Sequence, residues 1–525
     1  MNHVNLSFEQ INLLNRTQLS IASNQEELSD FINNSYTQEN FLKQIDLKKE
    51  SFTGQNRKLI AQYFKDLYSK IECPEELKDN IYNLSNPNSF TITTGHQLTL
   101  FGGPAFFFNK IIHIISLCES LNKCYPKYHF TPVFWMASED HDYDEIKEVN
   151  IYNSSFKWQT NQRGAVGRFE LGSIDEIKSQ FIDLFSNGSS DDVISFINAY
   201  EGNSLSEALF NFLHSIFASK GLLIIDADDK KLKKVFSPIM REEIENEVIY
   251  NSVNQTNIQL LNQGFKVQAH ARQVNLFYLT NNSRQRIIKK SDSYEIGENI
   301  LSKDELLSLL ESEPHNFSPN VLFRPIYQES ILPNLCYVGG GGEMSYWLQL
   351  KSSFDQFKIP YPIISQRKIV FYLNKNIQKK IKKINLPIAS FFKEFSLVKK
   401  EYLKSINQEV NYIDVDQKLN VFSNSILELS KDIDSQVKFS VGADLEKINK
   451  LNKQIKKRIE KSVTIKNEQN IELISKVKSY LFPSNIPQER FCHFFQFSNQ
   501  GKLDILSYLL EEFEPFNHSV LIVYE

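Results

Sequence analysis

Short apolar runs with strand character alternate with helical runs through much of this chain, and that alternation constrains the fold most. The runs 90–94, 128–136 and 221–226 are rich in β-branched and aromatic residues, whereas 106–121 and 229–251 carry helical patterns. Strands that alternate with helices favour a parallel sheet with helices on both faces. We therefore predict an α/β core built on a doubly wound parallel sheet.

Two stretches interrupt this alternation. Residues 150–205 contain short alternating strands around Trp158 and Arg168, and residues 263–300 alternate in the same way. Neither stretch continues the strand and helix pattern on its two sides. We interpret both as insertions on the core.

Strand character returns at residues 322–326 and 362–364, and a long helical tract follows Pro387. Residues 1–85, before the first core strand, are polar and mostly helical. We predict the following division: an N-terminal helical segment with the first half of the core (1–149), a first insertion (150–205), core (206–262), a second insertion (263–300), the second half of the core (301–374), a helical coiled-coil domain (375–480) and a C-terminal segment that packs back on the core (481–525).

Apolar residues in the helical tract recur at steps of three and four, as in the seam of a coiled coil. They are Leu445, Ile448, Leu451, Ile455, Ile459 and Val463. The basic run 453–461 lies among them and could also suit a nucleic-acid-binding helix. No aromatic residue interleaves with that run, as binding to single strands would favour. We favour a solvated coiled-coil face and expect no nucleic-acid partner.

Charge and cysteine usage exclude several classes of protein. The 525 residues include 59 basic and 63 acidic side chains, a net charge of −4, so the surface as a whole has no field that gathers nucleic acid or anionic membrane. The five cysteines are scattered without zinc-binding spacing. The N-terminus has no signal-peptide pattern, and no apolar run approaches the ~20 residues that span a bilayer. We expect a cytoplasmic protein with no membrane partner.

A first polar cluster follows the run 90–94, where an open parallel sheet keeps its ligand site. It consists of Thr94, Gly95, His96 and Gln97, with Gly102 and Gly103 shortly after. The two glycines and Pro104 precede a helix, where backbone amides can approach an anion. A tight turn into the helix explains these residues equally well.

A second cluster follows the run 128–136 directly. It extends from Ser138 to Glu145, and its acid and imidazole side chains are Glu139, Asp140, His141, Asp142, Asp144 and Glu145. Carboxylates packed around an imidazole repel one another and hold a proton or a cation. An N-cap at Ser138 with acids in the first helical turn would be a purely structural alternative. We favour proton transfer, ahead of metal binding, because no distant His or Cys partner is evident.

A third cluster lies between 324 and 367. Its candidate binding residues are Arg324, Gln328, Glu329, Tyr337, Gly339, Gly340, Gly341, Gly342, Glu343, Trp347 and Arg367. Four consecutive glycines cost backbone entropy and suit amides that face an anion, and either arginine could fork onto a carboxylate or phosphate. A surface salt bridge is the alternative for each arginine. Known nucleophile and phosphate-loop motifs are absent, and Cys336 is the one cysteine beside this cluster.

Four linked blocks resemble one protein family. They are TTGHQLTLFGGPAFFFNKI, TPVFWMASEDHDYDEI, LFRPIYQESILPNLCYVGGGGEMSYWLQL and PIISQR, in that order, and the resemblance extends to Gln488-Glu489-Arg490. They look like the signature blocks of the cysteine-adding enzymes of bacillithiol biosynthesis. The family more often has Gln where this chain has His96, and Pro within the glycine run at Gly341.

The resemblance implies a Rossmann-like core with two connective insertions and an α-helical coiled-coil domain that forms a homodimer. It also implies a ligase that adds L-cysteine to the amine of glucosaminyl-malate. Its site would be lined by residues of the three clusters, and the first block adds Asn109 and Lys110. Glu139, Asp140, His141, Asp142, His96 and Arg324 would be the catalytic residues.

Forming an amide from a free carboxylate is uphill in free energy, so the resemblance implies activation of the cysteine carboxyl through ATP or another nucleotide. We identify no metal ligands in the sequence and leave the metal requirement open. A carboxylate of the second cluster would accept the amine proton, and Arg324 or His96 would stabilise negative charge. Two alternatives stay open: another adenylate-forming or nucleotidyl-transfer enzyme of the same fold, and a non-catalytic coiled-coil or RNA-binding relative.

Overall fold

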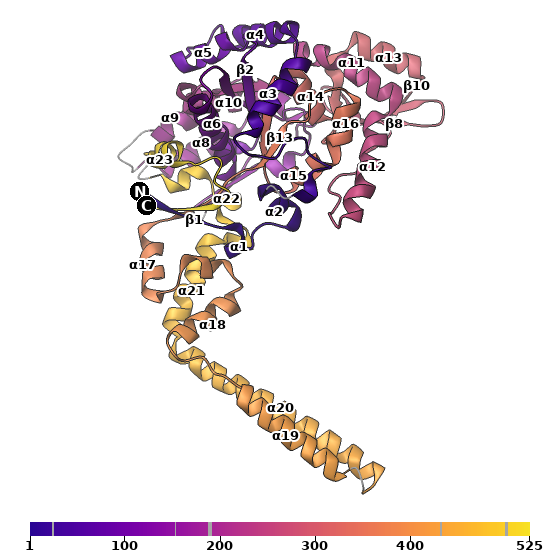
Figure 1. Ribbon diagram of the computed structural model, residues 1–525. Coiled ribbons are helices and arrows are strands. Elements are labelled where there is room, and N and C mark those ends of the chain that lie inside the picture. Colours follow the sequence, from indigo (N-terminus) through magenta and orange to yellow (C-terminus); the bar gives the residue numbers. More distant parts are fainter. Residues whose placement is uncertain (24–25, 153, 187–191, 431–432, 499–501) are drawn as a thin grey trace. The chain divides into compact units, whose positions relative to one another are not determined.

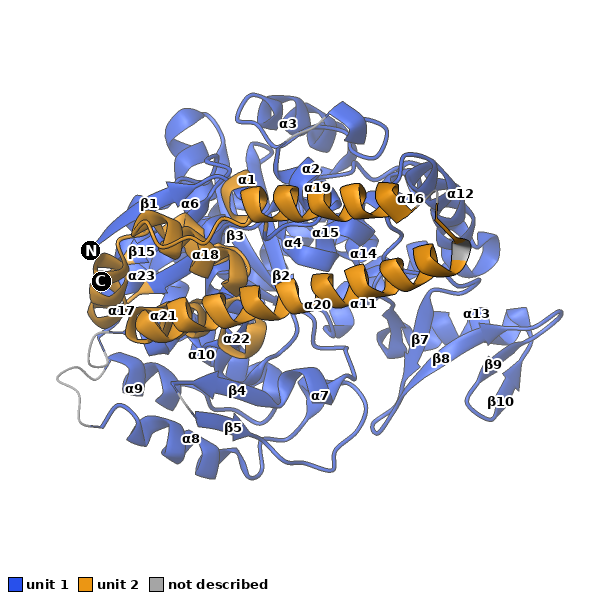
Figure 2. Ribbon diagram, turned by 90° about the horizontal axis from the view of Figure 1, so that it is seen from below, with its two compact units in different colours: residues 1–8, 13–372, 489–523 blue, residues 9–12, 373–488, 524–525 orange. Residues whose placement is uncertain are grey.

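The structure is a computed structural model that describes residues 1–23, 26–152, 154–186, 192–430, 433–498 and 502–525 (Figure 1). The chain forms two compact units (Figure 2). Unit 1 contains residues 1–8, 13–372 and 489–523, and unit 2 contains residues 9–12, 373–488 and 524–525. None of the helices in the described part of the chain combines the length and apolar character needed to cross a membrane.

Unit 1 is built on a five-stranded parallel sheet, which confirms the predicted fold class. The strand order is β13-β12-β2-β3-β6. The strands are β2 (Ser89–His96), β3 (His129–Met136), β6 (Leu223–Asp226), β12 (Asn334–Gly339) and β13 (Ile363–Gln366). Nearly every residue of these strands is buried, because helices cover both faces. His96 pairs with Met136 and Gly339 with Gln366, so the carboxyl ends of neighbouring strands are level and their following loops meet.

Helices connect and cover the sheet, as the alternation predicts (Figure 1). They are α6 (Phe106–Cys124), α10 (Leu205–Phe217), α11 (Lys230–Asn246), α12 (Val248–Asn262), α14 (Arg324–Ile331), α15 (Gly341–Trp347) and α16 (Lys351–Gln356). The N-terminal segment is also mostly helical, with β1 (Asn2–Leu6), α1 (Phe8–Ile11), α2 (Arg16–Ala22), α3 (Asn40–Ser51), α4 (Gly54–Tyr68) and α5 (Glu75–Asn83). A second sheet has the order β1-β15-β14, with β14 (Ile369–Leu373) and β15 (Val520–Tyr524). The tail also contains α22 (Gln488–Phe491) and α23 (Asp504–Glu512).

The predicted strand at 322–326 is wrong, because this segment turns into helix α14. Pro325 occupies the first turn, where a missing N–H costs nothing. Phe323 before the helix and Ile326 and Tyr327 within it lie at helical spacing and are all fully buried. The apolar residues that suggested a strand therefore cover one face of a helix.

The first insertion contains fewer strands than predicted. Strands β4 (Glu148–Ile151) and β5 (Ser154–Lys157) pair beside Trp158, and helices α7 (Tyr143–Ile146), α8 (Ile174–Asp183) and α9 (Asp192–Asn198) lie around them. The segment around Arg168 is a short 3-10 turn, since Arg168 forks onto Asp228 at 2.6 and 3.0 Å. A strand was expected there.

The predicted second insertion, residues 263–300, contains the expected short strands, but they belong to an antiparallel sheet that extends beyond these bounds to β11. The strand order is β10-β9-β8-β7-β11. The elements are β7 (Leu276–Leu279), β8 (Arg284–Lys289), β9 (Tyr294–Ile296), β10 (Asn299–Leu301), α13 (Lys303–Ser312) and β11 (Phe317–Pro319).

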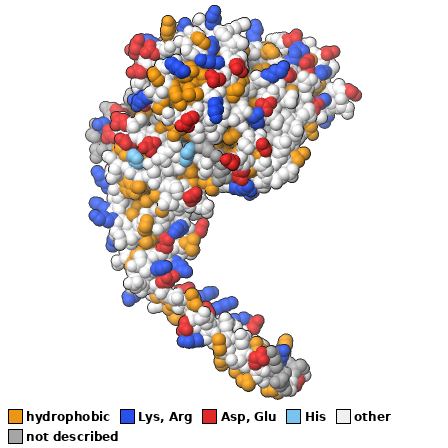
Figure 3. Space-filling model, viewed as in Figure 1, with side chains coloured by type: hydrophobic (Ala, Val, Ile, Leu, Met, Phe, Trp, Pro, Cys, Tyr) orange, Lys and Arg blue, Asp and Glu red, His pale blue; other side chains and the backbone are white. Residues whose placement is uncertain are grey.

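Unit 2 is helical. It contains α17 (Lys375–Ile384), α18 (Phe395–Ser405), α19 (Ile413–Ser430), α20 (Ser435–Lys466) and α21 (Glu468–Leu481). Helices α19 and α20 lie side by side, and Lys456 of α20 forms an ion pair with Asp416 of α19 (Figure 1). Of the predicted seam on α20, Leu445 is 7% exposed but Leu451 is 56% and Ile455 53% exposed. Apolar side chains are visible along these two helices (Figure 3).

Candidate active site

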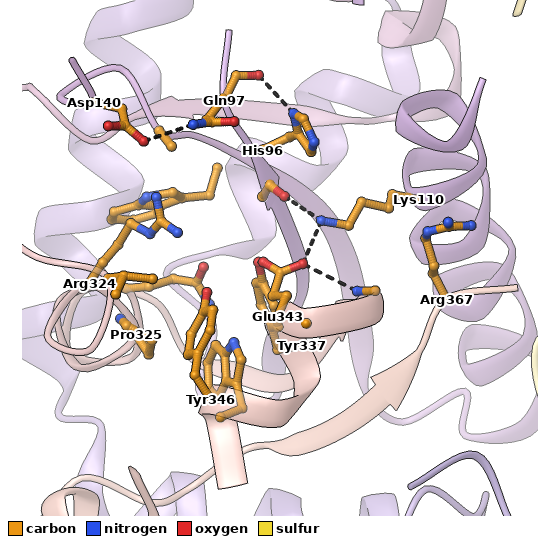
Figure 4. A pocket seen from close by; sticks show the side chains of 18 of the residues that line it. His96, Gln97, Lys110, Asp140, Arg324, Pro325, Tyr337, Glu343, Tyr346 and Arg367 are labelled. Atoms are coloured by element: carbon orange, nitrogen blue, oxygen red, sulfur yellow. Dashed lines mark hydrogen bonds and ion pairs between the residues drawn. The ribbon is translucent and has the colours of Figure 1, made fainter. Parts of the chain in front are cut away.

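A cavity of about 620 Å³ lies within unit 1, where the loops after β2, β3 and β12 meet (Figure 4). Thirteen of the predicted site residues line it: Gly95, His96, Gln97, Lys110, Asp140, Arg324, Gln328, Tyr337, Gly340, Gly342, Glu343, Trp347 and Arg367. They come from all three sequence clusters. The carboxyl edge of the sheet thus brings together residues far apart in the chain, such as Lys110 and Glu343, which are 233 positions apart.

A buried ion pair lies on one side of the cavity. Lys110, on α6, donates to the Glu343 carboxylate at 2.8 Å and to the carbonyl of Gly95 at 2.7 Å. Tyr337 donates its hydroxyl to the other oxygen of Glu343. Burial alone would raise the pKa of Glu343, but Lys110 and Tyr337 hold it below its ordinary value, while burial lowers the pKa of Lys110. Glu343 also accepts from the Gly340 amide, so this glycine-run amide is already occupied.

Asp140 lies on the opposite side of the cavity (Figure 4). Its carboxylate accepts from the side-chain amide of Gln97 at 3.0 Å and from the backbone N–H of His141 at 2.8 Å. Burial acts to raise the pKa of Asp140, but the His141 side chain, the charge of Arg284 and the hydrogen bond from Gln97 hold it well below its usual range. Asp140 is therefore an anion at any physiological pH and is suited to bind an ammonium group.

His96 is a neutral imidazole in the cavity wall. Its Nδ1 lies 3.0 Å from the carbonyl oxygen of Gln97, so Nδ1 carries the hydrogen and Nε2 is left as an acceptor. Burial lowers the pKa of His96 to about 4. The ring packs edge-on against Phe106 and Phe107. The one N–H of this neutral ring is used by Gln97, so His96 has none left to stabilise negative charge, which is the role that the resemblance implied.

Arg367 was predicted to fork onto a ligand, but it forks onto Glu489. The two bonds measure 2.8 and 2.6 Å, and the side chains are 4% and 2% exposed. Glu489 also accepts from the side chain of Asn109 and from the backbone N–H of Val370. Arg367 and Asn109 therefore fix the C-terminal segment to the core, and a Cβ at Gly340 would lie 2.8 Å from the Arg367 Nε.

Glu139 was predicted to be catalytic, but it is held in a buried ionic cluster. Lys233 contacts Glu139 at 2.7 Å and Asp228 at 2.6 Å, and the Lys233 side chain is 1% exposed. Arg168 completes the cluster through Asp228. Burial raises the pKa of Glu139 although Lys233 opposes that shift. This cluster fixes the loop after β3, so Glu139 positions Asp140.

The remaining predicted residues lie outside the cavity wall. Thr94 is buried and donates to the carbonyl of Val338, and Glu329 is buried against Lys48 and Asn334. Gly102 and Gly103 have positive φ and pack against Phe108 and Thr99, so the tight-turn interpretation is correct for them. The others that do not line it are Gly339, Gly341, His141 and Asp142. His141 is about half exposed and contacts Arg284 beside Asp140.

Sequence reasoning missed several residues of the cavity wall. They include Phe106, Trp135, Glu145, Gln268, Tyr346 and Arg490. Glu145 ends the acidic cluster that the sequence singled out, and it accepts from the Gln97 amide at 2.8 Å. Arg490 belongs to the Gln488-Glu489-Arg490 segment of the resemblance, which was the available signal. Arg324 and Arg490 are the cavity-lining cations that have no carboxylate partner within ion-pair distance among the described residues.

Few residues in the described part of the chain suit metal binding or thiol chemistry. Across the described ranges, no three His, Cys, Asp or Glu side chains converge as metal ligands would. Cys336 is fully buried in β12, and burial raises the pKa of its thiol. It does not line the cavity.

Comparison with known families covers both parts of the chain. Residues 1–368 match the family model described as bacillithiol biosynthesis BshC, N-terminal Rossmann-like domain. Residues 370–525 match the C-terminal coiled-coil domain of BshC. The chain belongs to the BshC family. The core, the coiled-coil region and the resemblance of the four blocks are thereby confirmed for this BshC member.

Curated BshC relatives match over most of their length. A protein of Flavobacterium johnsoniae is 37% identical over 512 residues, covering 95% of each chain. One of Christiangramia forsetii is 33% identical and covers 99% of this chain and 98% of its own. A protein of Staphylococcus aureus strain COL is 26% identical, and the match covers 85% of this chain and 86% of its own. Each of the three is named "Putative cysteine ligase BshC".

Proposed function

We propose that this chain is a ligase that joins the carboxyl group of L-cysteine to the amine of glucosaminyl-malate, which gives bacillithiol. Family membership and the names of the relatives support this proposal. The observation that carries it is the composition of the cavity wall, where Arg324 and Arg490 can take a carboxylate and Asp140 can take an ammonium group. These are the two charged groups that the reaction brings together.

The reaction forms one C–N bond and breaks one C–O bond. The sugar ammonium group first loses one proton to water, and the neutral amine then attacks the cysteine carboxyl carbon. The activated oxygen leaves, and the nitrogen loses its second proton. ATP or another nucleotide would supply the leaving group, and Arg324 and Arg490 would hold its anionic oxygens or those of the cysteine carboxylate. Asp140 binds the amine and accepts its proton during attack, when the nitrogen gains positive charge and becomes strongly acidic.

Reconstitution tests this function directly. Purified protein, L-cysteine, glucosaminyl-malate and ATP should give a thiol whose mass is the sum of the two substrates minus water, and omission of any component should abolish it. L-serine in place of L-cysteine serves as the control for the acid. Absence of product with ATP and with other nucleoside triphosphates would refute the proposal, and an amide formed only from another acid or amine would favour a different ligase of this fold.

Asp140→Asn should lower the rate of amide formation by about 100-fold or more, because the amine loses its anionic partner in the cavity. His141→Ala should change the rate by only about twofold, since His141 is half exposed and lies outside the cavity wall. Both variants are compared with the wild type by steady-state kinetics and thermal unfolding. Equal losses in the two variants, at equal stability, would contradict these roles.

His96→Gln should keep the rate within about threefold, because glutamine offers a neutral acceptor where the imidazole has Nε2. His96→Leu should cost about tenfold, since it removes that acceptor. Because the pKa of His96 is about 4, its protonation should lower the rate only as pH falls toward 4. A pH–rate inflection near 6.5 that disappears in His96→Gln would contradict a neutral imidazole.

We also propose that the chain forms a homodimer through α19 and α20 and that the reaction takes place in the cytoplasm. The half-exposed seam residues Leu451 and Ile455, with Val421 66% exposed on α19, support a second copy as the partner. All five cysteines are free thiols, which suits a reducing compartment.

Leu451→Glu should shift the mass measured by light scattering from dimer to monomer, while Lys457→Glu on the same helix should not. A wild-type monomer would refute the dimer.

A further inference from the structure

A second cavity of about 450 Å³ adjoins the first within unit 1. Six residues line both cavities: Ala137, Asp140, Gln268, Ala269, Val321 and Arg324. The wall of the second cavity otherwise comes from Glu139 after β3, from the loop before β7, from β7 and β8, and from the end of β11 with the segment that follows it. We call this second cavity the arginine annex.

The strand geometry directs basic side chains into the annex. Arg284 and Arg286 are two positions apart on β8, so they share one face of the sheet. Phe277 pairs with Arg286 on the neighbouring strand. Its ring stacks against both guanidinium groups, with the ring centroid 4.1 Å from the Cζ of Arg284 and 5.7 Å from the Cζ of Arg286. Arg272, in the loop before β7, also lines the annex.

The charges of the annex do not balance. Its two carboxylates are already paired, Glu139 with Lys233 at 2.7 Å and Asp140 with Arg284 at 3.6 Å. Arg272, Arg286 and Arg324 have no carboxylate within ion-pair distance among the described residues. Three guanidinium groups around one cavity repel one another and favour a ligand that carries more than one negative charge.

We infer that the arginine annex binds a dianionic part of a substrate, through Arg272 and Arg286. This inference rests on the proposed function, under which the dianion is the malate dicarboxylate of the sugar acceptor. In a glucosaminyl-malate the amine and the malate are carried by adjacent ring carbons, so their binding sites must adjoin. Asp140 lines both cavities, and an acceptor with malate in the annex presents its amine there. Nucleotide phosphates share this charge and are the other possible source.

Equilibrium binding to Arg272→Gln and Arg286→Gln tests the inference. Isothermal titration is done with glucosaminyl-malate, with D-glucosamine, which lacks the malate, and with ATP. Each variant should bind glucosaminyl-malate about tenfold more weakly, the cost of one charge-assisted contact, with D-glucosamine and ATP unchanged. Lys290→Gln is the matched control, because Lys290 lies on the same insertion, pairs with Glu295 and does not line the annex. Thermal unfolding checks that each variant is folded.

Each other outcome has a distinct meaning. Wild-type affinity for glucosaminyl-malate in both arginine variants would overturn the inference. A loss of ATP affinity alone would assign the annex to phosphate and overturn the malate assignment. If the wild type binds glucosaminyl-malate through these arginines but yields no amide with cysteine, the proposed function fails and the annex stands. If both variants form the amide at unchanged KM, only the annex fails.

Discussion

Replacing Lys110 by methionine should lower the rate of amide formation by at least about 100-fold, the usual cost of removing a charged group that is aimed into a catalytic cavity. Lys110 has three N–H donors, and two are used by Glu343 and the carbonyl of Gly95. The third has no partner among the described residues, while the side chain lines the cavity and is 3% exposed. It is therefore available to a substrate oxygen.

A double variant separates the loss of activity from the loss of stability. Lys110→Met alone leaves the Glu343 carboxylate without its cation, which should lower the thermal midpoint and raise the pKa of Glu343. Lys110→Met combined with Glu343→Gln removes that uncompensated charge, so the midpoint should recover while the rate stays low. Lys123→Met, on the exposed end of the same helix, is the control. A double variant with wild-type activity would contradict a role for Lys110 in the reaction.

Arg367→Met should destabilise the protein by about 3–5 kcal/mol, because it leaves the Glu489 carboxylate buried and unpaired. Arg367→Met combined with Glu489→Gln should regain most of that loss. Glutamine removes the charge but keeps an oxygen that can accept from Asn109 and from the Val370 N–H. Guanidinium unfolding of the four proteins of this cycle gives the coupling free energy.

One result would refute this account of the ion pair. Additive effects of Arg367→Met and Glu489→Gln would mean that the pair does not join the C-terminal segment to the core. Lys375→Met serves as the control, because the Lys375 side chain is 75% exposed and its contact with Glu525 is 3.9 Å. That control should change the free energy of unfolding by about 0.5 kcal/mol or less.

The sequence was sufficient to predict a strand where one continuous apolar run forms that strand. The strands at 128–136 and 221–226 are buried on both faces, so their β-branched and aromatic residues are continuous and easy to identify. The segment 322–326 misled because its apolar residues fit a strand as well as a helical face, and only the turn at Pro325 settles which forms. Short apolar runs carry no period that separates the two.

The cavity was predicted in part because loops after neighbouring parallel strands must meet. That rule brings together Gly95, Asp140 and Gly340 without any knowledge of side-chain pairing. The partners of charged residues could not be predicted in this way. Arg367 and Glu489 are 122 positions apart, and Lys233 reaches Glu139 from helix α11. Sequence patterns report the period of burial and leave such pairs undetermined.

A crystal structure of the protein soaked with L-cysteine and glucosaminyl-malate tests the central claim most directly, because anomalous scattering locates the sulfur of the bound cysteine. We predict this sulfur inside the cavity that Arg324, Arg490 and Asp140 line, with the sugar amine at Asp140. Sulfur bound reproducibly elsewhere, with this cavity empty, would contradict it.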